Sequence, residues 1–166
     1  MTLAVREADL QIRYDVVVQA LREAFGARLK TVVLFGSQAR GQASVDSDHD
    51  LLVVVEGLPT DPLKRQREAR APLLSILDRT PGAIAFVAKT PSEVDANLTP
   101  LLLDVCADGV SLYGAEYFEP YRRKALAALR QAGMDRKKIG QAWMWTLPCG
   151  PSGDWELTWD GYRERA

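Results

Sequence analysis

The stretch TVVLFGSQARGQASVDSDHDLLVVV, residues 31–55, holds two short apolar runs separated by a polar segment. The runs at 31–35 and 49–55 are rich in β-branched residues and have the length and composition of strands buried on both faces. The segment 36–48 between them has room for one short helical turn and a loop. This part of the chain therefore predicts a strand, a turn that opens with glycine, and a second strand.

Gly36 and Ser37 stand where the first predicted strand meets the turn. Glycine lacks the Cβ that would hold a ligand away from the backbone, and amides at the start of a helical turn can point together at a phosphate. Ser37 adds a hydroxyl donor, and Arg40, one helical turn later, is placed to contact phosphate oxygens or to hold the following loop. Glycine after a strand is also typical of an ordinary turn, so these residues alone leave both interpretations open.

Asp48 and Asp50 flank His49 at the start of the second predicted strand. Because side chains alternate along a strand, both carboxylates leave the same face, ~7 Å apart along the chain. His49 faces the opposite side, where a packing or surface role is expected and a ligand role is the alternative. Carboxylate oxygens suit Mg²⁺, which also prefers phosphate oxygens and keeps some of its waters. The pair is a candidate metal site in which Asp50 is better placed to bridge two ions, with capping of the loop as the alternative.

Taken together, residues 36–54 resemble the pattern G-S-x-A-R-G followed by S-D-x-D-L-x-V of the minimal nucleotidyltransferase (MNT) domains in the DNA polymerase β-like superfamily. Weaker likeness continues through KTPSEV and GVSLYG to about residue 130. The resemblance implies an α/β (α+β) fold, with a mixed β-sheet flanked by helices. It also implies transfer of a nucleoside monophosphate from ATP or another NTP, with Mg²⁺ or Mn²⁺, to an acceptor hydroxyl.

The same resemblance implies a role for each residue of the motif. Gly36 and Ser37 bind the triphosphate, and Asp48 and Asp50 hold the metals and are the catalytic pair. With Arg40 as a further phosphate contact, these five residues form the predicted site.

One position departs from the family pattern. The family uses a third carboxylate from a neighbouring strand, and alignment through the shared Thr90-Pro91 places Ala85 at that position. That carboxylate is the one poised to accept the proton of the acceptor hydroxyl, and loss of a general base typically costs ~10²–10⁴ in rate. The change therefore affects chemistry more than nucleotide binding. Other acids lie nearby in sequence, but none sits at the matching strand position: Asp78, Glu93 and Asp95.

Periodicity and capping signals outline the rest of a domain at 1–133. The first helix is expected to bury a stripe of Ile12, Val16, Ala20 and Ala24, with Val17 and Leu21 beside it. This first helix is expected at 5–25. The elements expected after the second strand are a helix at 62–78 with a kink or break at Pro72, a strand at 83–88, a helix from Thr90 to Ala107 interrupted at Thr99-Pro100, a strand at 110–113, and a helix through 118–129 that ends at Gly133.

The tail at 134–166 contains all four tryptophans. The segments WMWTL (143–147) and WELTW (155–159) alternate with period two around PCGPSGD, which predicts a β-hairpin between them. We expect this hairpin to pack on the domain or on another copy of the chain, with stacking on a base or acceptor ring as the alternative. The basic runs 122–124 and 136–138 are typical of solvated faces, with contacts to RNA or acceptor phosphate as the alternative.

Composition excludes several classes of protein. A formal net charge of −1 over 166 residues provides no general attraction to nucleic acid or to a membrane surface. The chain shows neither a signal peptide nor an apolar run of bilayer length, so we expect a cytoplasmic protein. Cys106, in a predicted helix, and Cys149, in a predicted loop, indicate neither a disulfide framework nor a zinc site.

The sequence therefore predicts a nucleotidyltransferase that moves a nucleoside monophosphate, favoured as AMP, from NTP to a hydroxyl of a protein or small molecule. The alternative is a catalytically impaired nucleotide-binding or partner-binding module, such as an MNT antitoxin that acts with a HEPN toxin. A HEPN-type protein is thus a candidate partner. The acceptor, the preferred base and the possibility of a homo-oligomer stay open at this point.

Overall fold

A computed structural model describes residues 3–140, 142–147 and 154–164. Its first half contains α1 (Leu3–Phe25), the 3₁₀ turn η1 (Gly26–Arg28), β1 (Leu29–Phe35), α2 (Gly36–Arg40), β2 (His49–Val55), α3 (Pro62–Leu74), the 3₁₀ turn η2 (Leu77–Arg79) and β3 (Ile84–Lys89). Its second half contains α4 (Pro91–Ala96), α5 (Pro100–Asp108), β4 (Val110–Tyr113), α6 (Ala115–Ala132), β5 (Asp135–Ile139), β6 (Ala142–Thr146), β7 (Trp155–Thr158) and β8 (Gly161–Glu164). The elements expected between residues 5 and 133 are all present, close to their predicted bounds.

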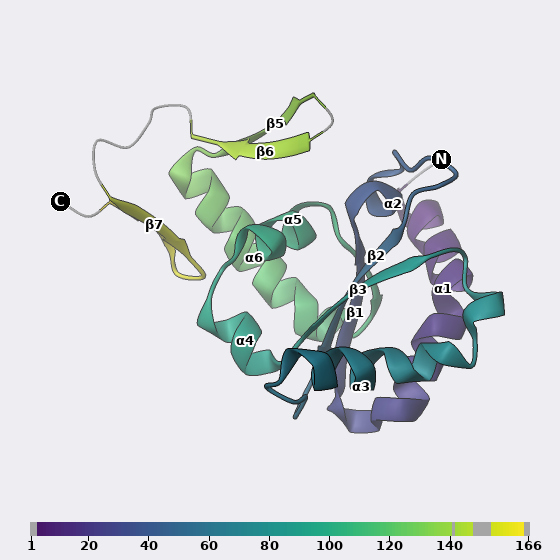
Figure 1. Ribbon diagram of the computed structural model, residues 1–166. Coiled ribbons are helices and arrows are strands. Elements are labelled where there is room, and N and C mark those ends of the chain that lie inside the picture. The colour runs from purple at the N-terminus through teal and green to yellow at the C-terminus, as the bar shows by residue number, and fades with distance from the viewer. Residues whose placement is uncertain (1–2, 141, 148–153, 165–166) are drawn as a thin grey trace.

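Four strands form one mixed sheet in the order β3-β2-β1-β4. β1 is antiparallel to both β2 and β4, and β2 is parallel to β3. Helices lie on both faces of this sheet, with α1 and α3 on one side and α5 and α6 on the other (Figure 1). The predicted mixed sheet flanked by helices is confirmed.

The two helical layers explain why the central strands are apolar on both faces. In β2, Leu51 and Val53 pack in the core beneath α1 and α3, whereas Leu52 and Val54 pack in the core beneath α5 and α6. All four side chains are at most 1% exposed. Burial of each such side chain contributes roughly 1.5–3 kcal/mol, so the strand is held from both sides.

The buried stripe of α1 differs from the predicted one. Tyr14, Val17, Leu21 and Phe25 face the sheet, whereas Ile12 is 77% exposed. The sequence carries two overlapping apolar stripes, and the one that contains two aromatic rings buries more surface. Tertiary packing therefore rotated the helix away from the stripe that begins at Ile12.

Local capping signals were read correctly. Thr90 accepts a hydrogen bond from the backbone of Glu93, and the Glu93 side chain accepts one from the Thr90 backbone, which completes the predicted capping box of α4. Thr99 caps α5, so the helix is interrupted at the predicted place. Pro72 lies inside α3, which ends two residues later at Leu74 before the separate turn η2.

The tail forms hairpins, but their strand partners differ from the prediction. β6, which holds Trp143 and Trp145, pairs with β5, and β7 pairs with β8. Each strand thus pairs across a short local turn, which costs less loop-closure entropy than the predicted connection at 148–154. Most of that connection, together with Cys149, lies outside the described residues. Cys106 is buried in α5 as a free thiol, as expected for a cysteine in a helix.

Both hairpins pack on the side of the molecule that carries α5 and α6 (Figure 1). The Trp145 indole donates a hydrogen bond to Asp104 Oδ1 at 2.9 Å, and the Trp159 indole donates one to the Val94 carbonyl at 2.7 Å. Within this chain the tail thus contacts the domain, which is one of the two arrangements expected for it. The division into a domain at 1–133 and a tail at 134–166 stays a prediction.

The basic run 136–138 is only in part the solvated face that was predicted. The Arg136 side chain is only 12% exposed and forms ion pairs with Asp104 and Asp108 of α5. Arg122, in the basic run 122–124, is also partly buried, and it donates a hydrogen bond to the Gly109 carbonyl. The adjacent Lys137 and Lys138 are exposed as predicted.

No helix among the described residues combines the length and the apolar character that a membrane crossing needs.

The capping box of α4 makes a prediction about stability and pH. Burial acts to raise the pKa of Glu93, but the hydrogen bond from the Thr90 backbone and the pairing with Arg65 outweigh it and lower the pKa below its usual value of 4.5. The stabilisation by ionised Glu93 is therefore complete when the pH is above the usual pKa of 4.5, and it is lost as the pH falls through the lower pKa of the folded state. We expect Glu93→Gln to lower the free energy of unfolding at pH 7 by about 1 kcal/mol.

Urea denaturation at pH 7 and at about pH 3 measures this effect. The difference between wild type and variant should shrink at the lower pH. Glu23→Gln, at an exposed carboxylate on α1, is the control and should change stability at neither pH. An equal loss at both pH values would show that the charge of Glu93 is not what stabilises the helix.

Candidate functional site

The predicted site residues meet at one edge of the sheet, where β1 ends and β2 and β3 begin. Asp50 pairs in register with Phe35 of β1 and with Ala85 of β3. Gly36 and Ser37 follow Phe35 directly as the first residues of α2. The antiparallel return from β1 to β2 therefore brings the glycine turn and the acidic pair together, as the motif predicts.

Two features of the structure require glycine at position 36: the backbone conformation there and the close approach of Asp50. Its φ is +71°, a conformation that L side chains rarely adopt. A Cβ at this position would collide with Oδ2 of Asp50 and would lie 3.2 Å from Cγ of the same side chain. The absence of a side chain at residue 36 is thus what lets the Asp50 carboxylate lie directly over the turn.

Neither carboxylate caps the loop that precedes β2. Among the described residues, Asp48 and Asp50 accept no hydrogen bond and form no ion pair. The loop is instead closed by Ser47, whose Oγ accepts a hydrogen bond from the Ser44 backbone at 2.9 Å. Loop capping, the alternative function of the acidic pair, therefore does not explain its presence.

The electrostatics of the pair favour a positively charged ligand. Burial raises the pKa of the half-buried Asp50 carboxyl, the charge of Asp48 raises it further, and Arg40 acts in the opposite direction. Asp48 itself is exposed. Two carboxylates held close together without a counter-ion are stabilised when a cation binds between them.

The residues present fit a divalent cation on the ground of donor chemistry. Both predicted ligands offer hard carboxylate oxygens, and the absence of a side chain at Gly36 leaves the space that Oδ2 of Asp50 occupies. Within the residues that the structure describes, no three His, Cys, Asp or Glu side chains gather around one point. A cation held here would therefore need oxygens from a ligand or from water in addition to the aspartates, which is how Mg²⁺ is usually bound beside phosphates.

Ser37 and the start of α2 provide the donors of the turn. The Ser37 carbonyl accepts a hydrogen bond from the Gln42 backbone at 2.9 Å, which closes the short helix. Its hydroxyl makes no hydrogen bond to any described residue. The first backbone N–H groups of a helix lack partners within the helix, so this turn has donors to offer an anion.

Arg40 points toward α5. Its Nη1 donates a hydrogen bond to Asp108 Oδ2 at 3.2 Å, and its guanidinium carbon lies 5.9 Å from the centre of the Trp143 ring. It forms no ion pair with Asp48 or Asp50, so the acidic pair is not neutralised by arginine. In the following loop Arg40 donates a hydrogen bond from Nε to Gln42 at 3.3 Å, and its predicted contact with phosphate stays a prediction.

His49 lies on the opposite face from the carboxylates, as the alternation of a strand predicts. It is 3% exposed, and its Nδ1 forms a hydrogen bond with the hydroxyl of Tyr14 in α1. Burial, with a smaller effect of Arg13, lowers the pKa of His49, and burial raises the pKa of Tyr14 to about 12. The pair joins β2 to α1, and the predicted packing role is confirmed.

Ala85 lies on the same face of the sheet as Asp50. The neighbouring Ile84 and Phe86 pack in the core beneath α1, whereas Val87 packs in the opposite core, so position 85 faces the side of α5. Because Asp50 and Ala85 are register partners, a carboxylate at position 85 would lie beside that of Asp50. Alanine carries no carboxylate, and the match of position 85 to the third acid of the family stays a prediction.

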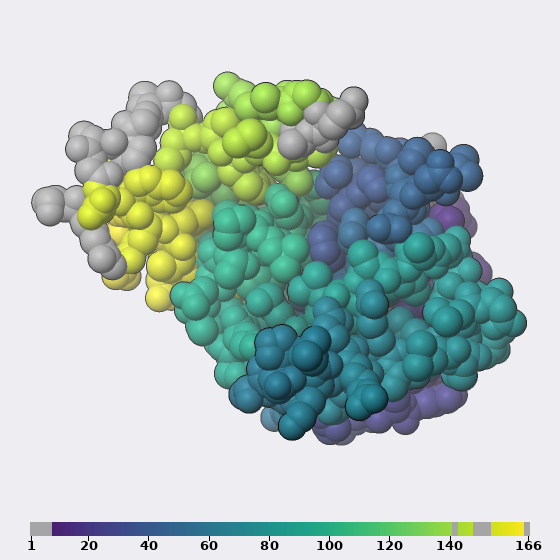
Figure 2. Space-filling view, viewed as in Figure 1, coloured from purple at the N-terminus to yellow at the C-terminus, as the bar shows by residue number. Residues whose placement is uncertain are grey.

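Three residues near the site were missed by sequence reasoning: Asp108, Arg136 and Trp143. Asp108 and Trp143 lie beside the guanidinium of Arg40, and Arg136 contacts both of them. Figure 2 shows the hairpin of β5 and β6 on the same side of the molecule as the segment 36–50. One signal was available, since Asp104 and Asp108 are four residues apart in the otherwise apolar helix α5. No local pattern in the sequence indicates that the hairpin of β5 and β6 lies beside Arg40.

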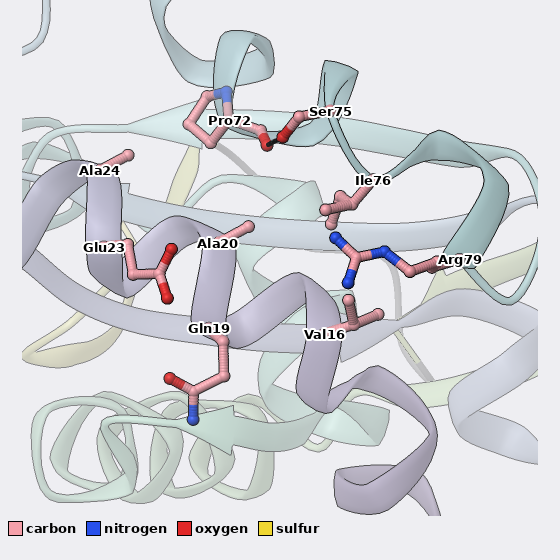
Figure 3. A pocket seen from close by; sticks show the side chains of 9 residues that line it. All are labelled: Val16, Gln19, Ala20, Glu23, Ala24, Pro72, Ser75, Ile76 and Arg79. Atoms are coloured by element: carbon pink, nitrogen blue, oxygen red, sulfur yellow. Dashed lines mark hydrogen bonds between the residues drawn. The ribbon is translucent and has the colours of Figure 1, made fainter.

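The cavity between α1 and α3 is not this site. It measures about 460 Å³ and includes Val16, Ile76 and Arg79 in its lining (Figure 3). None of the predicted site residues lines it, because it lies in the helical layer on the His49 side of the sheet. A second cavity of about 570 Å³ adjoins the loop before β2 and reaches Ser47 and His49.

Comparison with known proteins agrees with this geometry. The family model of the nucleotidyltransferase domain matches residues 14–94, which include the whole predicted site. A protein of Methanocaldococcus jannaschii, provisionally named a protein adenylyltransferase, is 30% identical over 105 residues, which are 63% of this chain and 71% of that protein. The chain belongs to the nucleotidyltransferase family, and the resemblance seen in residues 36–54 is confirmed.

Two solved structures share the fold. A toxin–antitoxin crystallised with AMP-PNP superposes with a TM-score of 0.51 and 24% identity, covering 70% of this chain and 86% of that chain. A mutant of the toxin–antitoxin MntA-HpeT superposes with a TM-score of 0.50 and 21% identity, covering 70% of this chain and 85% of that chain. Both likenesses support the fold.

The close approach at Gly36 predicts a specific failure in its alanine variant. Gly26 also has a positive φ, +52°, but no atom lies within 4 Å of a Cβ built there, so Gly26→Ala is a matched control. We expect Gly26→Ala to cost about 1–2 kcal/mol through backbone strain alone. Gly36→Ala should cost more, because it also displaces Asp50, and it should abolish nucleotide binding.

Urea denaturation and calorimetric titration with ATP and Mg²⁺ measure the two effects. Equal stability losses, together with intact nucleotide binding in Gly36→Ala, would contradict the close packing of Asp50 on the turn.

Proposed function

We propose that this nucleotidyltransferase transfers AMP from ATP to a hydroxyl group of a protein. The observation that carries the proposal is the position of Asp50 directly over the Gly36 turn, with Asp48 two residues earlier, just before β2, and no ion pair between either carboxylate and a cation of the described residues. An acidic pair beside the Ser37 hydroxyl and the amides that open α2 fits a triphosphate that arrives with its cation.

Each residue of the site has a distinct role in this proposal. Asp48 and Asp50 hold Mg²⁺, and the turn at Gly36 and Ser37 binds phosphate oxygens. Arg40, which lies within electrostatic reach of Asp50, adds a further phosphate contact. Bound Mg²⁺ would supply the positive charge that neutralises the triphosphate and the departing pyrophosphate.

The reaction forms one bond and breaks one. The acceptor oxygen bonds to the α-phosphorus of ATP, the bond between that phosphorus and the β-phosphate bridge breaks, and pyrophosphate leaves. The hydroxyl proton must pass to a base. Position 85 supplies none, so we infer that the proton passes to solvent and that the transfer is slow.

The proposal of a protein acceptor and AMP rests on the relatives. The relative from Methanocaldococcus jannaschii carries the name of a protein adenylyltransferase, and one structural neighbour was crystallised with AMP-PNP as a toxin–antitoxin. A HEPN-type toxin is a candidate acceptor by the same reasoning. The alternative of a binding module without catalysis was motivated by Ala85, but membership of the nucleotidyltransferase family favours the enzyme.

The direct test uses ATP labelled at the α-phosphate, with Mg²⁺ and candidate acceptor proteins. We expect label on the acceptor and release of pyrophosphate. A variant that carries both Asp48→Asn and Asp50→Asn should lose metal-dependent nucleotide binding and transfer. It should keep the melting temperature of the wild type, because neither carboxylate is bonded to described residues. A folded wild type that neither binds ATP with Mg²⁺ nor releases pyrophosphate would overturn the proposal.

A second test restores the missing acid. Ala85→Asp places a carboxylate beside Asp50 on a half-buried strand position, so we expect the transfer rate to rise by roughly tenfold or more. Ala85→Asn has nearly the same shape without the charge and should give no gain. Initial rates of label transfer at saturating ATP measure the difference. Equal rates in both variants would show that proton removal does not limit the reaction.

A further inference from the structure

The hairpin of β5 and β6 reaches the predicted nucleotide site. Trp143 and Trp145 occupy alternate positions of β6 and project to the same side, and the Arg136 guanidinium lies 5.4 Å from the centre of each ring. The Arg40 guanidinium lies over the same Trp143 ring at 5.9 Å. Trp143 therefore contacts one arginine from the hairpin and one from the turn that follows β1.

Asp108 connects the same two arginines. Its Oδ2 accepts a hydrogen bond from Arg136 and a second one, at 3.2 Å, from Nη1 of Arg40. Arg136 also forms an ion pair with Asp104 at 3.1 Å, so it helps to neutralise both acids on this face of α5. Asp108 is consequently shared, and Arg40 is not its only counter-charge.

This sharing leaves Arg40 able to bind a ligand. Within the described residues, its hydrogen bonds use Nε, to Gln42 at 3.3 Å, and Nη1, to Asp108. Nη2 keeps its donors for an anion. Without Arg136, Arg40 would be the counter-charge of Asp108. A carboxylate and a guanidinium then favour a bidentate ion pair, which would use two N–H donors of Arg40 that are otherwise open to a phosphate.

We infer that Arg136 and Trp143 are positioning residues of the nucleotide site, which hold Arg40 in the orientation that contacts phosphate. Arg136 neutralises Asp108, and the face of Trp143 supports the Arg40 guanidinium. The hairpin lies outside residues 14–94, where the family model matches. The inference rests on the proposed function, because it concerns binding of ATP with Mg²⁺.

A hairpin that only stabilises the fold would affect binding through stability alone. The two explanations separate in a double-mutant cycle with Arg40. If Arg136 and Trp143 act through Arg40, their removal matters only while Arg40 is present.

The test measures the Kd of ATP with Mg²⁺ by calorimetry, well below the melting temperature of each variant. We expect Arg40→Ala, Arg136→Ala and Trp143→Ala each to raise the Kd by roughly tenfold or more. In the Arg40→Ala background, neither second substitution should raise it further. Trp143→Phe keeps an aromatic face and should retain most of the wild-type affinity.

Trp155→Ala, in the separate hairpin of β7 and β8, is the matched control. Trp155 is 40% exposed and contacts Tyr162 rather than the site, so its loss should leave the Kd unchanged. Losses that add fully in the Arg40→Ala background would overturn the inference while the proposed function stands. Absence of ATP binding by the folded wild type would overturn the proposed function and this inference with it.

Discussion

The approach of the Asp50 carboxylate to the backbone of Gly36 is the constraint on which the site depends. The backbone of Asp50 is fixed by strand pairing on both sides, with Phe35 and with Ala85, so a clash with a side chain at residue 36 can be relieved only by rotation of the Asp50 carboxylate. Only a residue without a Cβ, and with the left-handed φ of +71°, fits beneath it. The acidic pair and the phosphate-binding turn thus occupy one place because the strands force them together.

The sheet also separates structural from functional polar groups. Alternation along β2 sends His49 to the side of α1, where it is bonded to Tyr14, and sends Asp50 to the side of α5. A buried histidine with a partner adds to packing, whereas carboxylates without partners carry an electrostatic cost that a bound cation relieves. The unpaired acids, rather than the cavity between α1 and α3, therefore mark the functional face of the molecule.

Much of the candidate site could be predicted because its parts are close in sequence. Gly36, Ser37 and the two aspartates lie within a single strand-turn-strand unit, where spacing and period determine which side chains share a face. The surroundings of Arg40 could not be predicted in this way. Asp108 and Trp143 come from an α-helix and a hairpin far along the chain, and only the packing of these elements on one face brings them to the arginine.

The sequence by itself determined the order of elements through residue 133, the capping of α4 and α5, and the pairing of a glycine turn with two carboxylates, because each depends on contacts within a few residues. The tertiary structure decided which stripe of α1 is buried, which strands of the tail pair, and whether Arg136 is solvated. In those cases several local arrangements were almost equally favourable. The choice among them came from apolar area buried and charges paired between distant segments.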